Sequence, residues 1–231
     1  MGKRIISQAR GHGSMTYRVR RRAFLIKIKY PMHEGEATIL DIVHSAGHSA
    51  PLLKIKVADE TFFIPAFKGA SVGQKIVING PAQIGNILPI KNVPMGTNVY
   101  NIEKNPGDGG KMIRTSGSSA MVFKKYDHNK YSLTMPNKHE VIIGGDCRVT
   151  VGVIAGEGRV LKPFVTAGNM WYKMKARNKL WPRTSAVKMN AVDHPFGSGR
   201  GKRIKSKIAK RNAPPGARVG HIRPRRTGWV R

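Results

Sequence analysis

The sequence predicts an all-β protein whose strand-rich middle lies between long basic N- and C-terminal extensions. The first observation is the distribution of charge. Residues 1–33 hold nine basic and no acidic side chains, and residues 161–231 hold 19 basic side chains against the single Asp193. Residues 34–160 hold 14 basic and 11 acidic side chains, and only this middle segment shows repeated short apolar alternations between turn formers. A nearly neutral body with two basic arms is typical of proteins whose extensions enter nucleic acid.

The first part of this middle segment, residues 34–82, is expected to form a small closed barrel of the OB-like kind. In the stretch LLKIKV, Leu53 and Ile55 would face a core while Lys54 and Lys56 would face water. Several short strands in close succession, with turn residues between them, favour such a barrel. The expected strands cover residues 36–43, 52–57, 61–66 and 75–78.

The second part, residues 83–160, is expected to form an SH3-like barrel built from a β-meander. Strong turn formers, such as those at residues 105–107 and 127–129, separate its apolar stretches at regular intervals. One larger sandwich over residues 34–160 is the alternative that the pattern leaves open. The expected strands cover residues 86–90, 98–102, 119–126, 130–134, 140–143 and 148–154.

The net charge indicates the class of partner. Among 231 residues, 42 are Lys or Arg and 12 are Asp or Glu, which gives a formal net charge of +30. A free domain usually carries roughly 2 to 8 net charges, so this excess indicates a polyanionic partner. With 40% hydrophobic residues, 26 Gly and 14 Pro, the chain can fill one or two small cores only. We therefore expect part of the chain to become ordered on its partner.

Several protein classes are disfavoured by what the sequence lacks. A single cysteine, Cys147, can form neither an internal disulfide nor a multi-thiolate zinc site, which favours a cytoplasmic protein. No apolar run approaches the roughly 20 residues of a membrane helix, and the N-terminus lacks a secretory signal. We also find no amphipathic helix suited to a membrane surface, so no membrane partner is expected.

Few residues are candidates for catalysis or metal binding. Asp193 and His194 could pair as an oriented general base, but adjacent side chains rarely face each other. His44 and His48 have the spacing of two metal ligands, but they lack a Cys or Glu partner nearby. The glycine-rich stretch at residues 197–202 misses the spacing of a phosphate-binding P-loop. We expect no enzyme, no catalytic residue, no metal site and no cofactor, apart from Mg²⁺ held by the phosphates of a bound RNA.

Basic clusters are the strongest functional signal, and they lie mainly in the extensions. One of these clusters lies on a short helix that is expected within residues 167–180. A solvated tail or a localisation signal is the simpler explanation. Interleaved aromatic residues such as Trp171 and Tyr172 favour RNA binding instead, because rings stack on bases while cations bind phosphates. The residues expected to bind RNA on this basis are Arg18, Arg20, Arg21, Arg22, Lys173, Lys175, Arg177, Arg200, Lys202, Arg203, Arg225 and Arg226.

Longer motifs resemble a known family. The stretches MNAVDHPFGSG (residues 189–199), RGHGS near the N-terminus, GNILPIKNVPMGTNVYNIEKNPGDGGKMIRTSGSSA and CRVTVGVIAG resemble the universal ribosomal protein L two family of the large subunit, in its archaeal and eukaryotic-like branch. The resemblance implies an OB-like barrel followed by an SH3-like barrel. It adds Lys111, Arg114, Asn190 and His194 as RNA-binding residues. Phe196 departs from the common pattern of the family, as does Ser198, so no second imidazole is expected there.

The resemblance also implies a function and a set of partners. It implies a structural component of the large ribosomal subunit that binds rRNA near the peptidyl transferase centre and supports assembly, subunit association and tRNA binding. Neighbouring ribosomal proteins and the small subunit are implied as partners on the cytoplasmic ribosome, without a homo-oligomer. Two alternatives are an RNA-modifying or RNA-cleaving enzyme that uses Asp193 and His194, and a soluble RNA-binding translation factor. A cycling factor would have to order two basic arms at each visit, which favours permanent integration.

Overall fold

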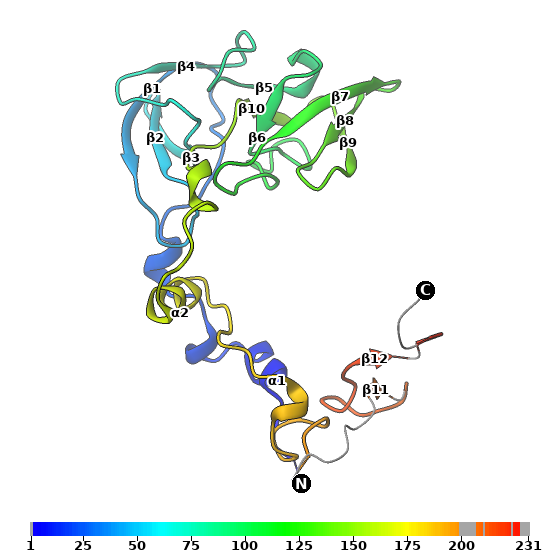
Figure 1. Ribbon diagram of the computed structural model, residues 1–231. Helices are drawn as coiled ribbons and strands as arrows, with labels where there is room; N and C mark the ends of the chain where they lie inside the picture. The colour runs from blue at the N-terminus through cyan, green and yellow to red at the C-terminus, as the bar shows by residue number, and fades with distance from the viewer. Residues whose placement is uncertain (1, 199–206, 210, 223, 227–231) are drawn as a thin grey trace. The chain divides into compact units, whose positions relative to one another are not determined.

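The computed structural model describes residues 2–198, 207–209, 211–222 and 224–226. The chain divides into two compact units, which are described separately below. One unit is Arg20–Arg177, and the other combines the described residues of Met1–Val19 and Asn178–Arg231 (Figure 1). The division of the sequence into segments 1–33, 34–82, 83–160 and 161–231 stays a prediction.

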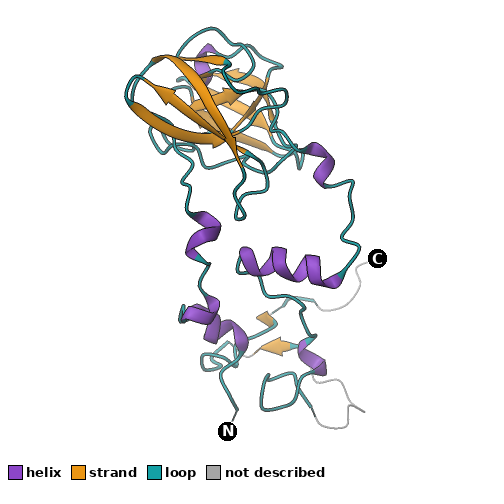
Figure 2. Ribbon diagram, turned by 90° about the vertical axis from the view of Figure 1, so that its left-hand side faces the viewer, coloured by secondary structure: helices purple, strands orange, loops and turns teal. Residues whose placement is uncertain are grey.

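The unit Arg20–Arg177 contains a ten-stranded sheet, which we call the β body (Figure 2). The strands follow the order β3-β2-β1-β4-β5-β10-β6-β7-β8-β9. Neighbouring strands are antiparallel except for β4 and β5, which pair in parallel through Ile78 and Ile87. The all-β prediction is confirmed, and each expected strand is present. The bounds are β1 Gly35–Val43, β2 Leu52–Val57, β3 Glu60–Pro65, β4 Lys75–Ile78, β5 Ile87–Pro89, β6 Asn98–Tyr100, β7 Ala120–Tyr126, β8 Lys130–Thr134, β9 Glu140–Gly144 and β10 Arg148–Val151.

Some strands are shorter than the sequence pattern predicts. The apolar run that suggested a strand over residues 148–154 is regular only to Val151. Gly152 follows with φ of +118°, a backbone conformation that ends the extended run and that a side chain would disfavour. Ile154 nevertheless remains buried and forms an isolated bridge with Phe67. The apolar pattern therefore identified the buried residues correctly but not the end of the ladder.

Two apolar clusters fill the β body. The first is contributed mainly by β1 to β4 and includes Leu53, Ile55 and Ile64, none of which is exposed. The second is contributed mainly by β5 to β10 and includes Val99, Leu133 and Val149. Lys54 and Lys56 lie outside the clusters, as the alternation in β2 predicts.

Helices are short throughout the described residues. The helix expected within residues 167–180 is present as α2, Ala167–Ala176, whose N-terminus is capped by the hydroxyl of Thr166. The sequence did not predict α1, because six residues are too few to show an apolar period. The remaining elements are α1 Ile6–Gly11, the 3-10 helices η1 Met15–Tyr17, η2 Arg21–Phe24, η3 Ile90–Asn92, η4 Glu157–Arg159 and η5 Ala186–Lys188, and the parallel pair β11 Ile208–Ala209 and β12 His221–Ile222.

The second unit contains little apolar core. Ile5 and Ala209 are the only buried hydrophobic residues among its described residues, and neither is fully buried. Polar contacts join its distant segments instead: the Arg10 guanidinium donates to the Asn178 carbonyl at 2.8 Å, and the Lys3 amide donates to the Val192 carbonyl at 2.9 Å. Among all described residues, no helix is long and apolar enough to cross a membrane.

Candidate nucleic-acid interface

A buried ion pair at β10 joins the β body to the segment that precedes β1. Glu103 is completely buried, and its carboxylate lies 3.0 Å from Nη2 of Arg148. The same carboxylate accepts the amides of Gly107 and Gly109. Arg148 uses Nη1 to donate to the Pro31 carbonyl at 2.7 Å, which lies far away in the sequence. Because the charges are paired and fully hydrogen-bonded, the burial is tolerated and Pro31 has a fixed position.

Tyr30 anchors the same segment from the other side. Its hydroxyl donates to the Asn101 carbonyl at 2.7 Å and lies 2.7 Å from the Thr150 hydroxyl. The Arg148 guanidinium lies 5.2 Å from the centre of the Tyr30 ring. Burial, as the main cause, raises the pKa of Tyr30 far above its ordinary value, so the phenol stays protonated. The chain leading back to Arg20 therefore starts from a rigid attachment.

The loop at residues 44–48 fixes the next part of this segment. The Gly47 amide donates to the Ala23 carbonyl at 2.7 Å, and the Phe24 ring packs edge-on to the His48 ring at 5.3 Å. A Cβ atom on Gly47 would lie only 2.2 Å from the Ala23 carbonyl oxygen. Ser45 is buried and its hydroxyl lies 2.8 Å from Nδ1 of His48. Glycine is therefore required for the close approach that holds η2.

Helix α2 presents cations and aromatic rings together. Nζ of Lys175 lies 4.2 Å from the centre of the Trp171 ring, and Nζ of Lys173 lies 4.4 Å from that of Phe164. These distances fit cation–π contacts, which hold the ammonium groups beside flat apolar surfaces. Both lysines lie in the last turn, where positive charge also favours the helix dipole.

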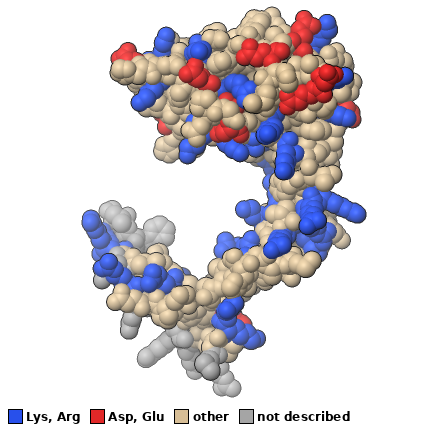
Figure 3. All heavy atoms as spheres, turned by 180° about the vertical axis from the view of Figure 1, so that it is seen from behind, with Lys and Arg blue, Asp and Glu red and all other residues tan. Residues whose placement is uncertain are grey.

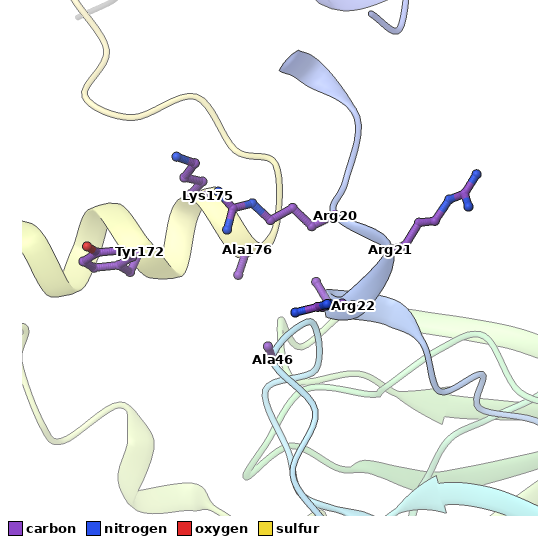
Figure 4. A pocket seen from close by; sticks show the side chains of 8 residues that line it. Arg20, Arg21, Arg22, Ala46, Tyr172, Lys175 and Ala176 are labelled. Carbon is purple, nitrogen blue, oxygen red and sulfur yellow. The ribbon is translucent and has the colours of Figure 1, made fainter. Parts of the chain in front are cut away.

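Residues of η2, the preceding Arg20, Ala46 and the last turns of α2 line one pocket of about 360 Å³, whose surface is mostly apolar. Figure 4 shows Arg20 extending toward α2 and Arg21 extending to the opposite side. Tyr172 is 70% exposed, so its ring is available for stacking. This arrangement can bind phosphates with Arg and Lys while a base stacks on the aromatic ring. The lining residues are Arg20, Arg21, Arg22, Ala23, Ala46, Tyr172, Lys175 and Ala176.

The charges of this pocket have no acidic partners. Within Arg20–Arg177, which is described completely, every ion pair lies between residues 33 and 157 and none involves η2 or α2. Figure 3 shows acidic residues over the β body, interspersed with basic ones. Burial, then Arg159 and Arg177, lower the pKa of Lys173 from its ordinary value. Positive charges that repel each other favour an anionic partner. We name Arg20, Arg21, Arg22, Lys173, Lys175 and Arg177 the cationic cluster.

Arg114, expected to bind RNA, is turned inward. Its Nε donates to the Asn101 side chain at 3.0 Å, and its Nη2 donates to the carbonyls of Gly109, Gly110 and Ile28. Burial is the main cause that lowers its pKa from the ordinary value. These contacts give Arg114 a structural role in joining the glycine-rich loop to the N-terminal segment, whatever else it binds.

The neighbouring glycine-rich loop uses its amides internally. The Gly107 and Gly109 amides donate to Glu103, and the Gly110 amide donates to Asp108 at 3.0 Å. The backbone donors that such a loop could offer to a phosphate are therefore already used. Lys111, by contrast, has an exposed side chain beside the loop.

In the second unit, the loop that contains His194 is tightly folded. The Asn190 carbonyl accepts the amides of Asp193 and His194 at 3.0 and 3.3 Å. The Phe196 amide donates to Nδ1 of His194 at 3.0 Å, and the two rings lie 5.0 Å apart. Asp193 is exposed, and among the described residues no contact joins its carboxylate to the His194 ring. A Cβ atom on Gly197 would lie 2.2 Å from the Asn190 oxygen, so the turn requires glycine.

The other expected site residues are spread over the chain. Arg18 is exposed and donates to the Gly13 carbonyl at 2.6 Å, and Arg225 and Arg226 are exposed. Arg200, Lys202 and Arg203 lie outside the described residues. Among the residues that the structure describes, no group of three or more His, Cys, Asp or Glu could hold a metal ion.

Sequence reasoning missed the loop that supports the cationic cluster. His44 and His48 were considered as metal ligands, whereas His48 packs on Phe24. Burial first, then Arg114 and Arg177, lower the pKa of His48. Gly47 was the only residue whose type indicated a close contact in this loop. The sequence does not show that the contact is made with Ala23, 24 positions away.

Comparison with known proteins identifies the relatives of this chain. A family model described as Ribosomal Proteins L2, C-terminal domain, matches residues 83–216. Three curated relatives bear the name Large ribosomal subunit protein uL2. That of Archaeoglobus fulgidus is 43% identical over 236 residues, and that of Methanococcus maripaludis is 43% identical over 239 residues. That of Methanocella arvoryzae is 42% identical over 236 residues. Each alignment covers 99% of this chain and 99% of the relative.

Proposed function

Because the chain belongs to the uL2 family of large ribosomal subunit proteins, we propose that it anchors itself in large-subunit rRNA through the cationic cluster. Membership in the family makes it an RNA-binding ribosomal protein that serves translation on the cytoplasmic ribosome. The observation that carries the proposal is the absence of acidic partners for Arg20, Arg21, Arg22, Lys173 and Lys175 within the completely described unit. Phosphates would neutralise these charges and release counterions.

The rigid support of the cluster favours a defined site over a loose electrostatic contact. The Gly47 amide holds Ala23, and the Arg148 guanidinium holds Pro31, so the arginines that precede them emerge from a fixed backbone. A preorganised cationic surface loses little conformational entropy on binding. This supports a permanent structural role over that of a soluble translation factor that cycles on and off.

The finer position within the subunit rests on the family resemblance. We propose that the chain lies near the peptidyl transferase centre and supports its assembly, subunit association and tRNA binding. Neighbouring ribosomal proteins and the small subunit are the partners that this position implies. Exposed Lys111 and the loop of Asn190 and His194 would add RNA contacts.

We propose no catalytic role for this protein. The Phe196 amide occupies Nδ1 of His194, the atom that an aspartate partner would have to engage in an Asp–His pair. The carboxylate of Asp193 is exposed and makes no contact with that ring among the described residues. Mg²⁺ bound between phosphates and the protein would be held mainly by RNA oxygens.

We also propose that the two apolar clusters of the β body correspond to an OB-like barrel and an SH3-like barrel. The separation of the first cluster, around Leu53 and Ile64, from the second, around Val99 and Leu133, supports this assignment. The basic segments outside the β body would then be the extensions that enter RNA.

Sucrose-gradient fractionation of a cell lysate at low and high monovalent salt tests the proposal. We expect the chain to migrate with the large subunit and to remain there after the high-salt wash, because many phosphate contacts act together. Replacement of Arg20 and Arg22 by Gln should shift part of the chain to the top of the gradient at high salt. Release of the unaltered chain at moderate salt would instead favour the translation factor.

A further inference from the structure

The second unit contains a pocket that the cationic cluster does not explain. It has a volume of about 450 Å³ and is lined by residues 2–5 and 8, residues 191–195 except Asp193, and residues 215–217. This volume lies in the range of pockets that bind small molecules. Three chain segments that are distant in sequence form its walls, so the pocket depends on the folded unit.

The walls of the pocket are held in place. The Lys3 amide donates to the Val192 carbonyl at 2.9 Å, which joins two of the walls. Gly216 has φ of +87°, and a Cβ atom there would lie 2.7 Å from Oε1 of Gln8, which shows how closely the third wall approaches. A glycine is thus needed at this position for both its backbone conformation and its close approach to Gln8.

Two side chains of the lining carry hydrogen-bond donors that the contacts within the described residues leave unused. Because the Phe196 amide donates to Nδ1 of His194, the neutral ring carries its proton on Nε2. The Ile5 amide donates to Oε1 of Gln8 at 3.1 Å, which leaves the Nε2 group of Gln8 as the available part of that side chain. Both residues line the pocket, and neither Nε2 group donates a hydrogen bond to another described residue.

The remaining lining combines positive charge with flat apolar surface. Lys3 and Arg4 bring two cations, and no carboxylate belongs to the lining among the described residues. Pro195 and Pro215 contribute apolar rings. A nucleotide has the matching parts, namely a planar base and an anionic phosphate.

We propose that this pocket receives a single unpaired guanine nucleotide of the bound rRNA, with N7 and O6 of the base accepting hydrogen bonds from His194 and Gln8. Lys3 and Arg4 would bind its phosphate. Guanine presents two acceptors on this edge, whereas adenine presents N7 and an amino donor that would face another donor. With adenine, one protein donor would face the amino donor and lose its hydrogen bond, so the pocket would discriminate against adenine. This inference rests on the proposed rRNA binding.

Methylation of guanine N7 by dimethyl sulfate tests the inference directly, because the reagent attacks the atom assigned to the pocket. Large-subunit rRNA is probed alone, with the full-length chain and with variants. We expect one guanine to be protected by the unaltered chain and to regain full reactivity with His194→Ala. Overall rRNA affinity should fall by about tenfold or less, the effect of removing one hydrogen bond.

Two further variants keep the test decisive. Gln8→Glu retains the acceptor for the Ile5 amide but replaces the amide donor by a carboxylate, so protection should also disappear. His221→Ala serves as the matched control, because His221 is an exposed histidine of the same unit outside the pocket, and protection should persist. If rRNA binds normally and no guanine differs between the unaltered chain and either pocket variant, the inference is wrong while the proposed function stands. If the unaltered chain does not bind rRNA, the proposed function itself fails.

Discussion

The β body and the second unit fix their chains by different means. The β body buries two apolar clusters and pairs a fully buried carboxylate, Glu103, with Arg148. The second unit buries only Ile5 and Ala209 among the hydrophobic residues that are described there, and relies on backbone hydrogen bonds and close glycine contacts. Apolar burial is the main source of folding free energy. We therefore expect the second unit to be less stable than the β body, and to gain stability when a partner binds.

The largest expected effect comes from breaking the buried ion pair of the β body. Glu103→Gln should lower the free energy of unfolding by about 3–5 kcal/mol, because it leaves Arg148 without a counter-charge in a mostly buried position. Urea unfolding followed by circular dichroism measures the change. Glu36→Gln is the control, since its pair with Lys75 is exposed and should contribute about 1 kcal/mol or less. Equal decreases in the two variants would contradict the structural role of Glu103.

The next effect tests how the cationic cluster is attached to the β body. Gly47→Ala should destabilise Arg20–Arg177 by about 1–3 kcal/mol, because the new Cβ atom would meet the Ala23 carbonyl and the Phe24 ring. It should also weaken rRNA binding, because η2 has to move. Gly158→Ala is the control, as a Cβ atom there meets nothing. Urea unfolding measures the stability of both variants, and filter binding measures their affinity for rRNA. Unchanged rRNA affinity in Gly47→Ala would argue against a preorganised cationic cluster.

A third experiment separates binding from stability. Replacing Arg20 and Arg22 by Gln should leave the free energy of unfolding within about 0.5 kcal/mol, since neither side chain makes an ion pair in the completely described unit. The slope of log affinity against log salt should fall by roughly 0.7–0.9 for each phosphate that the variant no longer neutralises. Lys75→Gln, on the β body, should leave the slope nearly unchanged. An unaltered slope in the double variant would place the rRNA interface elsewhere.

The smallest effect is a pH dependence at the loop of His48. Burial and the nearby Arg114 and Arg177 lower the pKa of His48 below 6.5, so the folded state binds the proton less readily than the unfolded chain. The stability that the neutral His48 ring contributes is complete above pH 6.5 and is lost as the pH falls toward the lowered pKa. The urea concentration at the unfolding midpoint should therefore decrease as the pH is lowered from 7.5 to below 6.5. The variant His48→Gln should show a smaller decrease. A larger decrease of the midpoint in His48→Gln than in the unaltered chain would contradict the lowered pKa of His48.

Local patterns in the sequence were enough to predict most elements of the β body. The alternation of Leu53 and Ile55 with lysines identifies the faces of β2, and turn residues mark the strand ends. The cationic residues of η2 and α2 were also predicted, although not that they line one pocket.

Contacts between distant residues could not be predicted in this way. Arg148 and Pro31 are separated by 117 positions, and nothing in either local sequence indicates the other. The family resemblance implies that Arg114 binds RNA, and this stays a prediction, but no local pattern indicated the three carbonyls and the amide that its side chain contacts. Side-chain direction depends on what folding brings nearby, which composition and spacing do not encode.

The hydrogen bond between Pro31 and Arg148 can form only late in the synthesis of the chain. Pro31 is made early, but its partner Arg148 and the Tyr30 partner Thr150 are added only after most of the β body has been translated. Loop closure over such a span is slow and must wait for both ends. Until then the arginines of η2 are held only by contacts with the loop at residues 44–48, such as the hydrogen bond between Gly47 and Ala23. A nascent chain therefore exposes these positive charges before the β body that supports them is complete.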